Sequence, residues 1–231
     1  MKRRRCLLLG CVASAIIASG LSADGPSLAA PAPAVPDPNP ASLAGGYDGH
    51  QSEIAAMLDL GSDGRFHYGL SYGALDEEAR GKWEFDGSRV LLTSDPVVPP
   101  KFVVLSAKPL RARKLKLKLD LPCGMDRQYF SVRARLGDGR SIERQFGEEG
   151  LEVPLGPSER VASVAVMLPV YGLEGEPAPL PRARGGEVHF RFEANDLGKV
   201  DFERQPLLLE QGGIVLERHG RTIVFRHVPA Q

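Results

Sequence analysis

The stretch FHYGLSY, residues 66–72, alternates large apolar side chains with small or polar ones along its whole length. LKLKLDL at residues 115–121 and VHFRFE at residues 188–193 alternate in the same way. Successive side chains of a strand point to opposite faces, so a period of two predicts strands with one buried face. Turn signals lie between such runs: Asp63-Gly64, Asp86-Gly87, Asp138-Gly139 and His219-Gly220. Because these pairs accept positive φ, they are typical of tight hairpins, and the chain is predicted to be all-β.

Only residues 51–58 and 73–80 carry a short helix-like pattern in a chain punctuated by 26 Gly and 19 Pro. We expect a small antiparallel meander or barrel over residues 45–95 and a β-sandwich over residues 101–190, with a boundary at the sequence DPVVPP, residues 95–100. The C-terminal strands, within residues 191–231, either close the first barrel, which makes the sandwich an insertion, or complete the sandwich. A four-strand meander has open edges, which are an aggregation liability unless another strand pairs with them.

The N-terminus predicts export. Lys2 and three arginines precede an uncharged apolar run from Cys6 to Leu21, which ends in the small residues Ser22 and Ala23. A basic segment, a short apolar segment and a small-residue exit are typical of a secretory signal peptide, here residues 1–23. The run is shorter than the about 20 apolar residues that span a bilayer. We expect a periplasmic or extracellular protein, exported by a bacterium.

The cysteines leave one alternative to this predicted export signal, a lipoprotein signal. LLGC, residues 8–11, matches a lipobox, and lipidation of Cys11 would anchor the protein at the outer membrane. We favour two cysteines used as small hydrophobes within one apolar segment. Processing would leave Cys123 as the one cysteine, which excludes an intrachain disulfide. With no partner for a catalytic thiol nearby in sequence, we interpret Cys123 as a small buried residue.

Residues 24–44 are predicted to form a tether, because alternating Pro and Ala favours an extended chain that buries no core.

The whole chain has 29 basic and 29 acidic residues. Loss of the signal peptide removes four basic residues and leaves 25 against 29, a net charge of −4. A mildly acidic protein has no general attraction to nucleic acid, so no nucleic-acid partner is expected.

Residues 45–95 carry a recognisable order of motifs. A Gly-Gly-Tyr start is followed by an apolar strand, a DGRF turn at residues 63–66, a Gly-Lys-Trp strand at residues 81–83 and a final RVLL strand at residues 89–92. This order resembles small lipocalin-like barrels, and in particular the N-terminal domain of the NlpE-type copper-resistance lipoproteins. The resemblance implies a β-barrel. Those proteins carry a Cys-x-x-Cys pair after the opening strand, whereas residues 48–53 here contain no cysteine, so it gives no support to a copper site.

Barrels of this kind can hold one small ligand, and four aromatic residues are candidates to contact it: Phe66, Tyr68, Tyr72 and Trp83. Trp83 and Phe85 share one face of their strand while Lys82 and Glu84 take the other, which marks the Trp83 side as inward. We therefore expect Trp83 to pack in the barrel core. A barrel filled by these rings would favour a protein-binding role over ligand storage.

Catalytic and metal-binding patterns are weak. GLSYG at residues 69–73 matches the G-x-S-x-G nucleophile elbow, but Ser71 is predicted mid-strand and not on a strand-to-helix turn. The five histidines have no close i, i+4 spacing, so no metal site is predicted. The acidic run DEE, residues 76–78, lacks the pattern of a calcium loop and is interpreted as a hydrated loop. No Gly-rich phosphate loop precedes a helix, and we predict no cofactor.

Lys114, Lys116 and Lys118 project from one strand face, opposite the leucines. Such a stripe could meet an anionic partner, although lysines on an exposed strand also protect against edge pairing.

Three classes of function stay open. The leading one is a non-enzymatic exported envelope protein that binds a small apolar ligand or another envelope protein. The alternatives are a serine hydrolase-like enzyme that uses Ser71 and a structural or assembly factor of the envelope. Membrane association is expected only if Cys11 is lipidated.

Overall fold

The structure is a computed structural model that describes residues 40–229. The predicted signal peptide, with Cys11, and the predicted tether up to residue 39 lie outside the described residues. Nearly all regular structure is β-strand, which confirms the all-β prediction. The described helices are one α-turn, α1 (Pro40–Leu43), and two 3-10 turns, η1 (Arg127–Tyr129) and η2 (Pro169–Tyr171). No helix within residues 40–229 is long and apolar enough to cross a bilayer.

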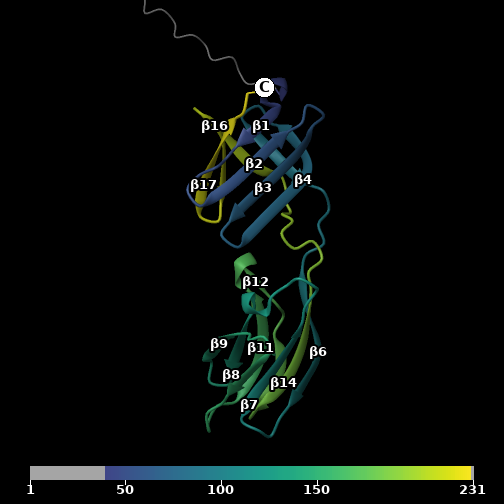
Figure 1. The fold of residues 1–231 in the computed structure, drawn as a ribbon, viewed down its shortest axis with the longest axis vertical. Helices are drawn as coiled ribbons and strands as arrows, with labels where there is room; N and C mark the ends of the chain where they lie inside the picture. Colours follow the sequence, from purple (N-terminus) through teal and green to yellow (C-terminus); the bar gives the residue numbers. More distant parts are fainter. Residues whose placement is uncertain (1–39, 230–231) are drawn as a thin grey trace, which may run out of the picture. The chain divides into compact units, whose positions relative to one another are not determined.

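Eight strands form a closed antiparallel barrel (Figure 1). Their order around the barrel is β1-β17-β16-β15-β5-β4-β3-β2. The strands are β1 (Gly45–Asp48), β2 (Ile54–Leu60), β3 (Arg65–Tyr72), β4 (Leu75–Phe85), β5 (Arg89–Ser94), β15 (Gln205–Glu210), β16 (Gly213–Arg218) and β17 (Arg221–His227). The C-terminal strands therefore close the first barrel, and the segment between β5 and β15 is an insertion. Closure removes the open edges that a meander ending at β5 would have.

Strand alternation fixes which side chains enter the barrel. β2 alternates buried and exposed positions without a break, and in β3 the even-numbered residues 66, 68 and 70 are buried. The two helix-like segments, residues 51–58 and 73–80, are mainly strand, in β2 and β4. A short apolar run does not distinguish the period of a helix from that of a strand, and here pairing with neighbouring strands favours the strand. β2 pairs with β1 and β3, and β4 with β3 and β5, so each gains two ladders that an isolated helix would forgo.

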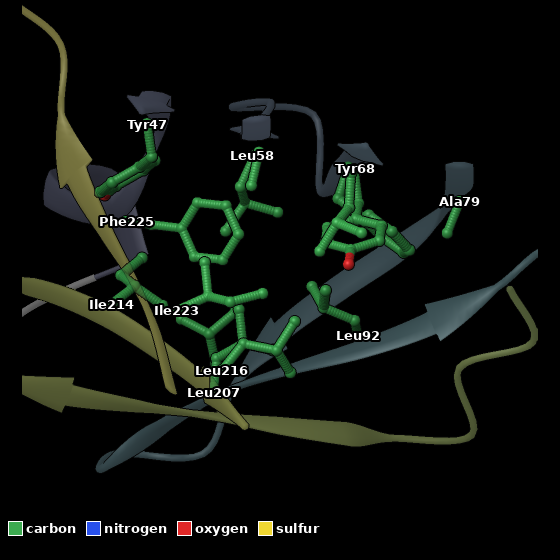
Figure 2. Close-up of a cluster of buried hydrophobic side chains, with 14 of the residues drawn as sticks. Tyr47, Leu58, Tyr68, Ala79, Leu92, Leu207, Ile214, Leu216, Ile223 and Phe225 are labelled. Atoms are coloured by element: carbon green, nitrogen blue, oxygen red, sulfur yellow. The ribbon is translucent and has the colours of Figure 1, made fainter. Parts of the chain in front are cut away.

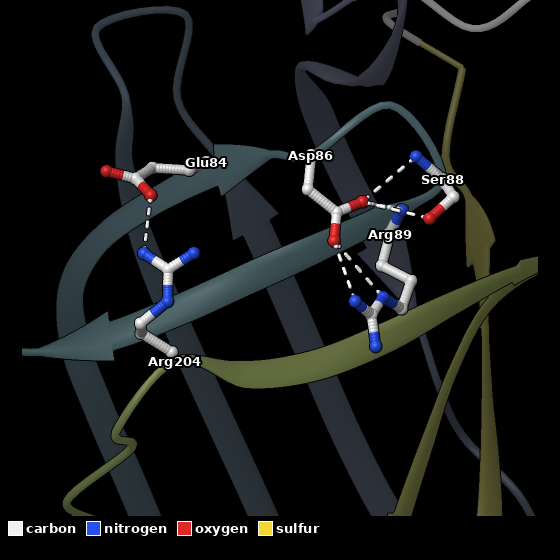
Figure 3. Close-up of polar contacts among 5 residues, drawn as sticks. All are labelled: Glu84, Asp86, Ser88, Arg89 and Arg204. Atoms are coloured by element: carbon white, nitrogen blue, oxygen red, sulfur yellow. Dashed lines mark hydrogen bonds and ion pairs between the residues drawn. The ribbon is translucent and has the colours of Figure 1, made fainter.

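The predicted hairpin turns have the expected backbone. Gly64, Gly87 and Gly139 all have positive φ, and the β16–β17 turn has φ of 52° at His219 and 69° at Gly220. The β4–β5 turn is further held by one carboxylate (Figure 3). Asp86 Oδ1 accepts hydrogen bonds from the backbone N–H of Ser88 at 3.0 Å and of Arg89 at 2.8 Å, while Oδ2 accepts from the Arg89 guanidinium. These donors, the backbone amides first, lower the pKa of Asp86 to about 2.

The inserted segment forms two facing sheets, a β-sandwich. One sheet has the order β10-β7-β14-β6 and the other β12-β11-β8-β9, with β13 also paired to β11. The strands are β6 (Lys101–Pro109), β7 (Lys114–Asp120), β8 (Ser131–Leu136), β9 (Ser141–Gln145), β10 (Leu151–Pro154), β11 (Val161–Leu168), β12 (Leu173–Glu174), β13 (Ala178–Ala183) and β14 (Gly186–Glu193). The alternating leucines of β7 and the apolar face of β14 lie in a core separate from that of the barrel. β14 runs to Glu193, so the sandwich ends three residues later than the expected residue 190.

Two linkers join the sandwich to the barrel, and hydrogen bonds hold them side by side. Val98 N–H donates to Asp196 Oδ2 at 2.9 Å, and Asp196 N–H donates to the Val98 carbonyl at 3.1 Å. Nearer the barrel, Ser94 Oγ donates to the Val200 carbonyl at 2.8 Å and accepts from Phe202 N–H at 3.0 Å. The residues just before β15 therefore lie beside the end of β5 in space. The insertion leaves and re-enters the barrel at one place.

Candidate functional site

The four aromatic residues predicted to contact a ligand lie in or at the barrel core. Phe66, Tyr68 and Trp83 have 3%, 0% and 7% of their surface exposed, and Tyr72 is half-buried against the same cluster. Trp83 Nε1 donates to the Gly61 carbonyl at 2.9 Å, so its one polar group is satisfied within the barrel. Burial of Trp83 is as the alternation predicted. The rings are positioned to pack against one another.

The lumen of the barrel is filled from every side. Each of the eight strands contributes a buried side chain to one cluster (Figure 2): Tyr47, Leu58, Tyr68, Ala79, Leu92, Leu207, Leu216 and Phe225. The rings of Tyr68 and Phe225 meet in a T-shaped arrangement with centroids 6.4 Å apart. Interiors packed in this way hold few voids larger than a water molecule.

A ninth contribution to this core comes from the returning linker. Phe202 is not part of a strand, yet it is 2% exposed. Its ring centroid lies 5.3 Å from that of Tyr68 in a T-shaped contact and 6.2 Å from that of Phe66. The guanidinium of Arg218 covers the Phe202 ring, with Cζ 5.4 Å from the centroid. The insertion therefore supplies a residue that helps to fill the barrel.

An ion-paired cluster occupies the end of the barrel where β4 begins and β16 ends. Glu77 stands between Leu75 and Ala79 on the inward face of β4, and its side chain is 8% exposed. Arg218 donates to both carboxylate oxygens, at 2.6 Å from Nε and 2.7 Å from Nη2, and His219 Nε2 lies 2.9 Å from Oε1. The interpretation of residues 76–78 as a hydrated loop is wrong, because they belong to β4 and the middle carboxylate points inward.

The electrostatics of this cluster follow from burial and pairing. Burial works against the charged form of Arg218, but hydrogen bonds to Glu77 and its negative charge outweigh that effect and raise the pKa of Arg218. A bidentate, charge-assisted pair of this kind is among the stronger hydrogen-bonded arrangements. Both charged groups are thereby engaged with each other. The geometry therefore supports a structural role for the Glu77–Arg218 ion pair, which closes one end of the barrel.

Next to this pair lies the hydroxyl of Tyr68, which is close to Glu77 and Arg218 but makes no hydrogen bond of good geometry with them. Tyr68 is fully buried, and its Oη has no hydrogen bond among the described residues. Burial raises the pKa of the Tyr68 hydroxyl far above its usual value, the charge of Glu77 adds to the effect, and Arg218 opposes it. A second buried barrel tyrosine shows the usual arrangement, since Tyr47 Oη donates to the Leu43 carbonyl at 2.7 Å.

The remaining predicted chemical groups are engaged elsewhere. Ser71 lies on β3 on the face opposite Tyr68, and its Oγ donates to Asp76 Oδ1 at 2.6 Å. The residues after it form a turn into β4, where the nucleophile elbow requires a helix. Among residues 40–229 no group of three or more His, Cys, Asp and Glu side chains is arranged to hold a metal ion. Cys123 is exposed, so the expectation that it is buried is wrong.

The lysine stripe is largely matched by carboxylates. Lys114 and Lys116 both reach Glu152 on β10, at 2.9 and 3.4 Å, and Lys118 lies 3.6 Å from Glu187 on β14. The three lysines do project opposite the buried leucines, as predicted. Because the neighbouring strands bring glutamates to the same face, the stripe is part of a mixed-charge surface.

β6, the outermost strand of its sheet, was not predicted from the sequence. The run FVVLSA, residues 102–107, does not alternate, so the period-two pattern does not mark it as a strand. Val104 and Leu105 are 40% and 41% exposed, adjacent members of the small set of large apolar side chains that the described surface displays. The available signal was an apolar run enclosed by Lys101 and Lys108, directly after the proline-rich linker.

Comparison with protein-family models, with curated proteins and with solved structures finds no match to this chain. The resemblance of residues 45–95 to lipocalin-like and NlpE-type barrels therefore stays a prediction, beside an eight-stranded barrel that the structure itself contains.

Proposed function

We propose that this chain is an exported, non-enzymatic protein of the cell envelope that works by binding another protein. The observation that carries the proposal is the packed barrel. The aromatic side chains that could have contacted a stored ligand fill the lumen together with Phe202. With the lumen occupied, recognition falls to the outer surface, and the inserted sandwich, whose strands are not part of the barrel, adds further surface.

Export is the second part of the proposal, and it rests on the pattern of residues 2–23. Intact mass of the protein isolated from its native envelope tests it. We expect a chain that begins near Asp24 and carries no lipid. A mass that corresponds to a lipidated chain beginning at Cys11 would make the protein an anchored lipoprotein.

Chemical cross-linking in the intact envelope, followed by native mass spectrometry of the purified protein, tests the binding role. We expect a discrete adduct that contains one further polypeptide, and a non-cross-linked protein whose native and denatured masses agree. A small molecule retained in the native protein and lost on denaturation would favour ligand storage instead. Absence of any adduct would overturn the proposal, with or without such a ligand.

A further inference from the structure

We propose that the free edge of β6 is the docking site for an extended segment of another protein, apolar in its middle and acidic at the end that lies beside Lys108. This inference rests on the proposed binding function and names the surface and the partner's chemistry. The docked segment would add a fifth strand to the sheet β10-β7-β14-β6, the recognition mode known as β-augmentation.

The first support is the pairing of β6. It is the last strand of its sheet and pairs with β14 alone, from Lys101 opposite Glu193 to Pro109 opposite Gly186. A strand with a neighbour on one side presents a row of unpaired N–H and C=O groups on the other. Among the described residues the adjacent strand β13 is paired to β11 in the opposite sheet and forms no ladder with β6.

The second support is a comparison with the other outer strands of the sandwich. β10 has four residues and ends in Pro154, β9 contains Glu143 and Arg144, and β13 contains two prolines. Short length, charge and proline are the devices that keep an edge from pairing. β6 has nine residues, and no charge interrupts it between Lys101 and Lys108. It is the longest of these edges, and what protects it is a β-bulge at Leu105 and the lysines and proline at its ends, which leave its middle without charge or proline.

The shape of β6 adds to its exposure. The register with β14 jumps from Ser106 opposite His189 to Val104 opposite Phe190, so Leu105 is the extra residue of a β-bulge. A bulge locally increases the twist and re-aims a side chain. Here it coincides with the two exposed apolar residues, Val104 and Leu105, which are the anchors we assign to the docked segment.

Charge decides between partners. Lys101 is already paired with Glu193 at 3.0 Å, whereas Lys108 and Arg111 form no ion pair within the described part of the chain. Glu187 on β14 lies directly opposite Lys108, and its carboxylate is 3.6 Å from Lys118. Two lysines therefore share one carboxylate here and Arg111 follows shortly after β6, so an acidic segment would meet an excess of positive charge. A second copy is the less suitable occupant, because central antiparallel pairing of β6 with itself sets Lys101 opposite Lys108 twice. Like charges directly opposite each other destabilise a strand pair.

The test uses the full mature chain and fluorescein-labelled peptides, read by fluorescence anisotropy. The probes are DEVTVTVS and SVTVTVED, with acidic residues at either end, KKVTVTVS with basic residues, and DEVPVPVS as a control that cannot form the ladder. We expect one acidic probe to bind about tenfold more tightly than the basic probe, a difference of about 1.4 kcal/mol. DEVTVTVS binds if the added strand is antiparallel, and SVTVTVED binds if it is parallel. The proline probe should not bind.

Two variants place this binding on β6. Leu105→Lys puts a charge in the middle of the edge and should abolish binding of the acidic probe. Met57→Lys is the matched control, because Met57 is similarly exposed, at 46%, on barrel strand β2; it should bind as the unaltered chain does. Lys108→Glu should reverse the preference toward KKVTVTVS. Both side chains are exposed, so we expect each variant to fold, and thermal unfolding checks this.

The outcomes separate the two proposals. Equal binding of acidic and basic probes, binding of neither, or undiminished binding by Leu105→Lys would overturn the assignment of β6. So would a dimer in sedimentation that Leu105→Lys converts to monomer, because a second copy would then occupy the edge. If the envelope adduct persists in Leu105→Lys, the binding function stands and the surface lies elsewhere. If the unaltered chain gives no adduct, the function itself falls.

Discussion

Replacement of Tyr68 by phenylalanine should stabilise the barrel, which is the reverse of what loss of a buried hydroxyl usually does. The ring of Tyr68 is fully buried, and its Oη has no hydrogen bond among the described residues. Burial of a hydroxyl without a hydrogen bond costs about 1–3 kcal/mol in protein mutational data. Tyr68→Phe removes that cost and keeps the ring contacts with Phe202 and Phe225, so we expect the free energy of unfolding to rise by about 1–3 kcal/mol.

Tyr47→Phe is the matched control, with the opposite sign expected. Tyr47 is 6% exposed in the same cluster, but its Oη donates to the Leu43 carbonyl at 2.7 Å. Loss of that hydrogen bond should lower the free energy of unfolding by about 0.5–1.5 kcal/mol. The two variants delete the same atom from the same barrel. The difference between them isolates the effect of hydrogen bonding.

Urea unfolding followed by tryptophan fluorescence suits this comparison, because Trp83 is the single tryptophan and lies in the barrel core. We expect the midpoint to move up for Tyr68→Phe and down for Tyr47→Phe, with unchanged slopes. A Tyr68→Phe variant as destabilised as Tyr47→Phe would refute the reasoning. It would show that the Tyr68 hydroxyl has a partner, either Glu77, Arg218 or a bound water.

Three further predictions concern the core, the β4–β5 turn and the predicted nucleophile. Phe202→Ala should lower the free energy of unfolding of the barrel by about 3–5 kcal/mol, measured through Trp83, because it leaves a cavity between rings; Tyr129→Ala, at an exposed residue, should change it by less than about 0.5 kcal/mol. The folded-state pKa of Asp86 is lowered to about 2, so its contribution to stability is present above the unfolded pKa and is lost as pH falls toward 2. The urea midpoints of the unaltered chain and Asp86→Asn should therefore differ at pH 7 and converge near the folded-state pKa; a constant difference contradicts this. A fluorophosphonate probe should not label Ser71, and labelling that disappears in Ser71→Ala would revive the hydrolase alternative.

Strands whose two faces differ in polarity could be predicted from the sequence. β3, β7 and β14 alternate apolar and polar residues, and each has one buried face in the structure. β6 was not predicted because an outer strand with weak burial on both faces has no alternation to read. β13, with prolines at positions 179 and 181, was missed for a related reason, since proline ordinarily argues against a strand.

The ion pair at the barrel end shows a different limit. In the run of residues 76–78, three adjacent carboxylates suggest solvent, and only the alternation from Leu75 to Trp83 indicates that Glu77 points inward. Burial of that carboxylate is tolerable because Arg218 reaches it. The two residues are 141 positions apart in the sequence, and no local sequence pattern predicts that they form an ion pair. The sequence could place Glu77 on a strand face, but the closure of the barrel supplies its partner.

The linkers explain how a barrel can be interrupted between two paired strands. β5 ends at Ser94 and β15 begins at Gln205, yet these strands pair directly, with Leu92 opposite Gln205. A flexible loop of that length would add an entropic cost to their pairing, although the cost grows slowly with length. The hydrogen bonds between Val98 and Asp196 bring the two ends of the sandwich together. In the folded chain β5 and β15 are therefore joined through a short, held connection, and Phe202 enters the barrel core from that connection.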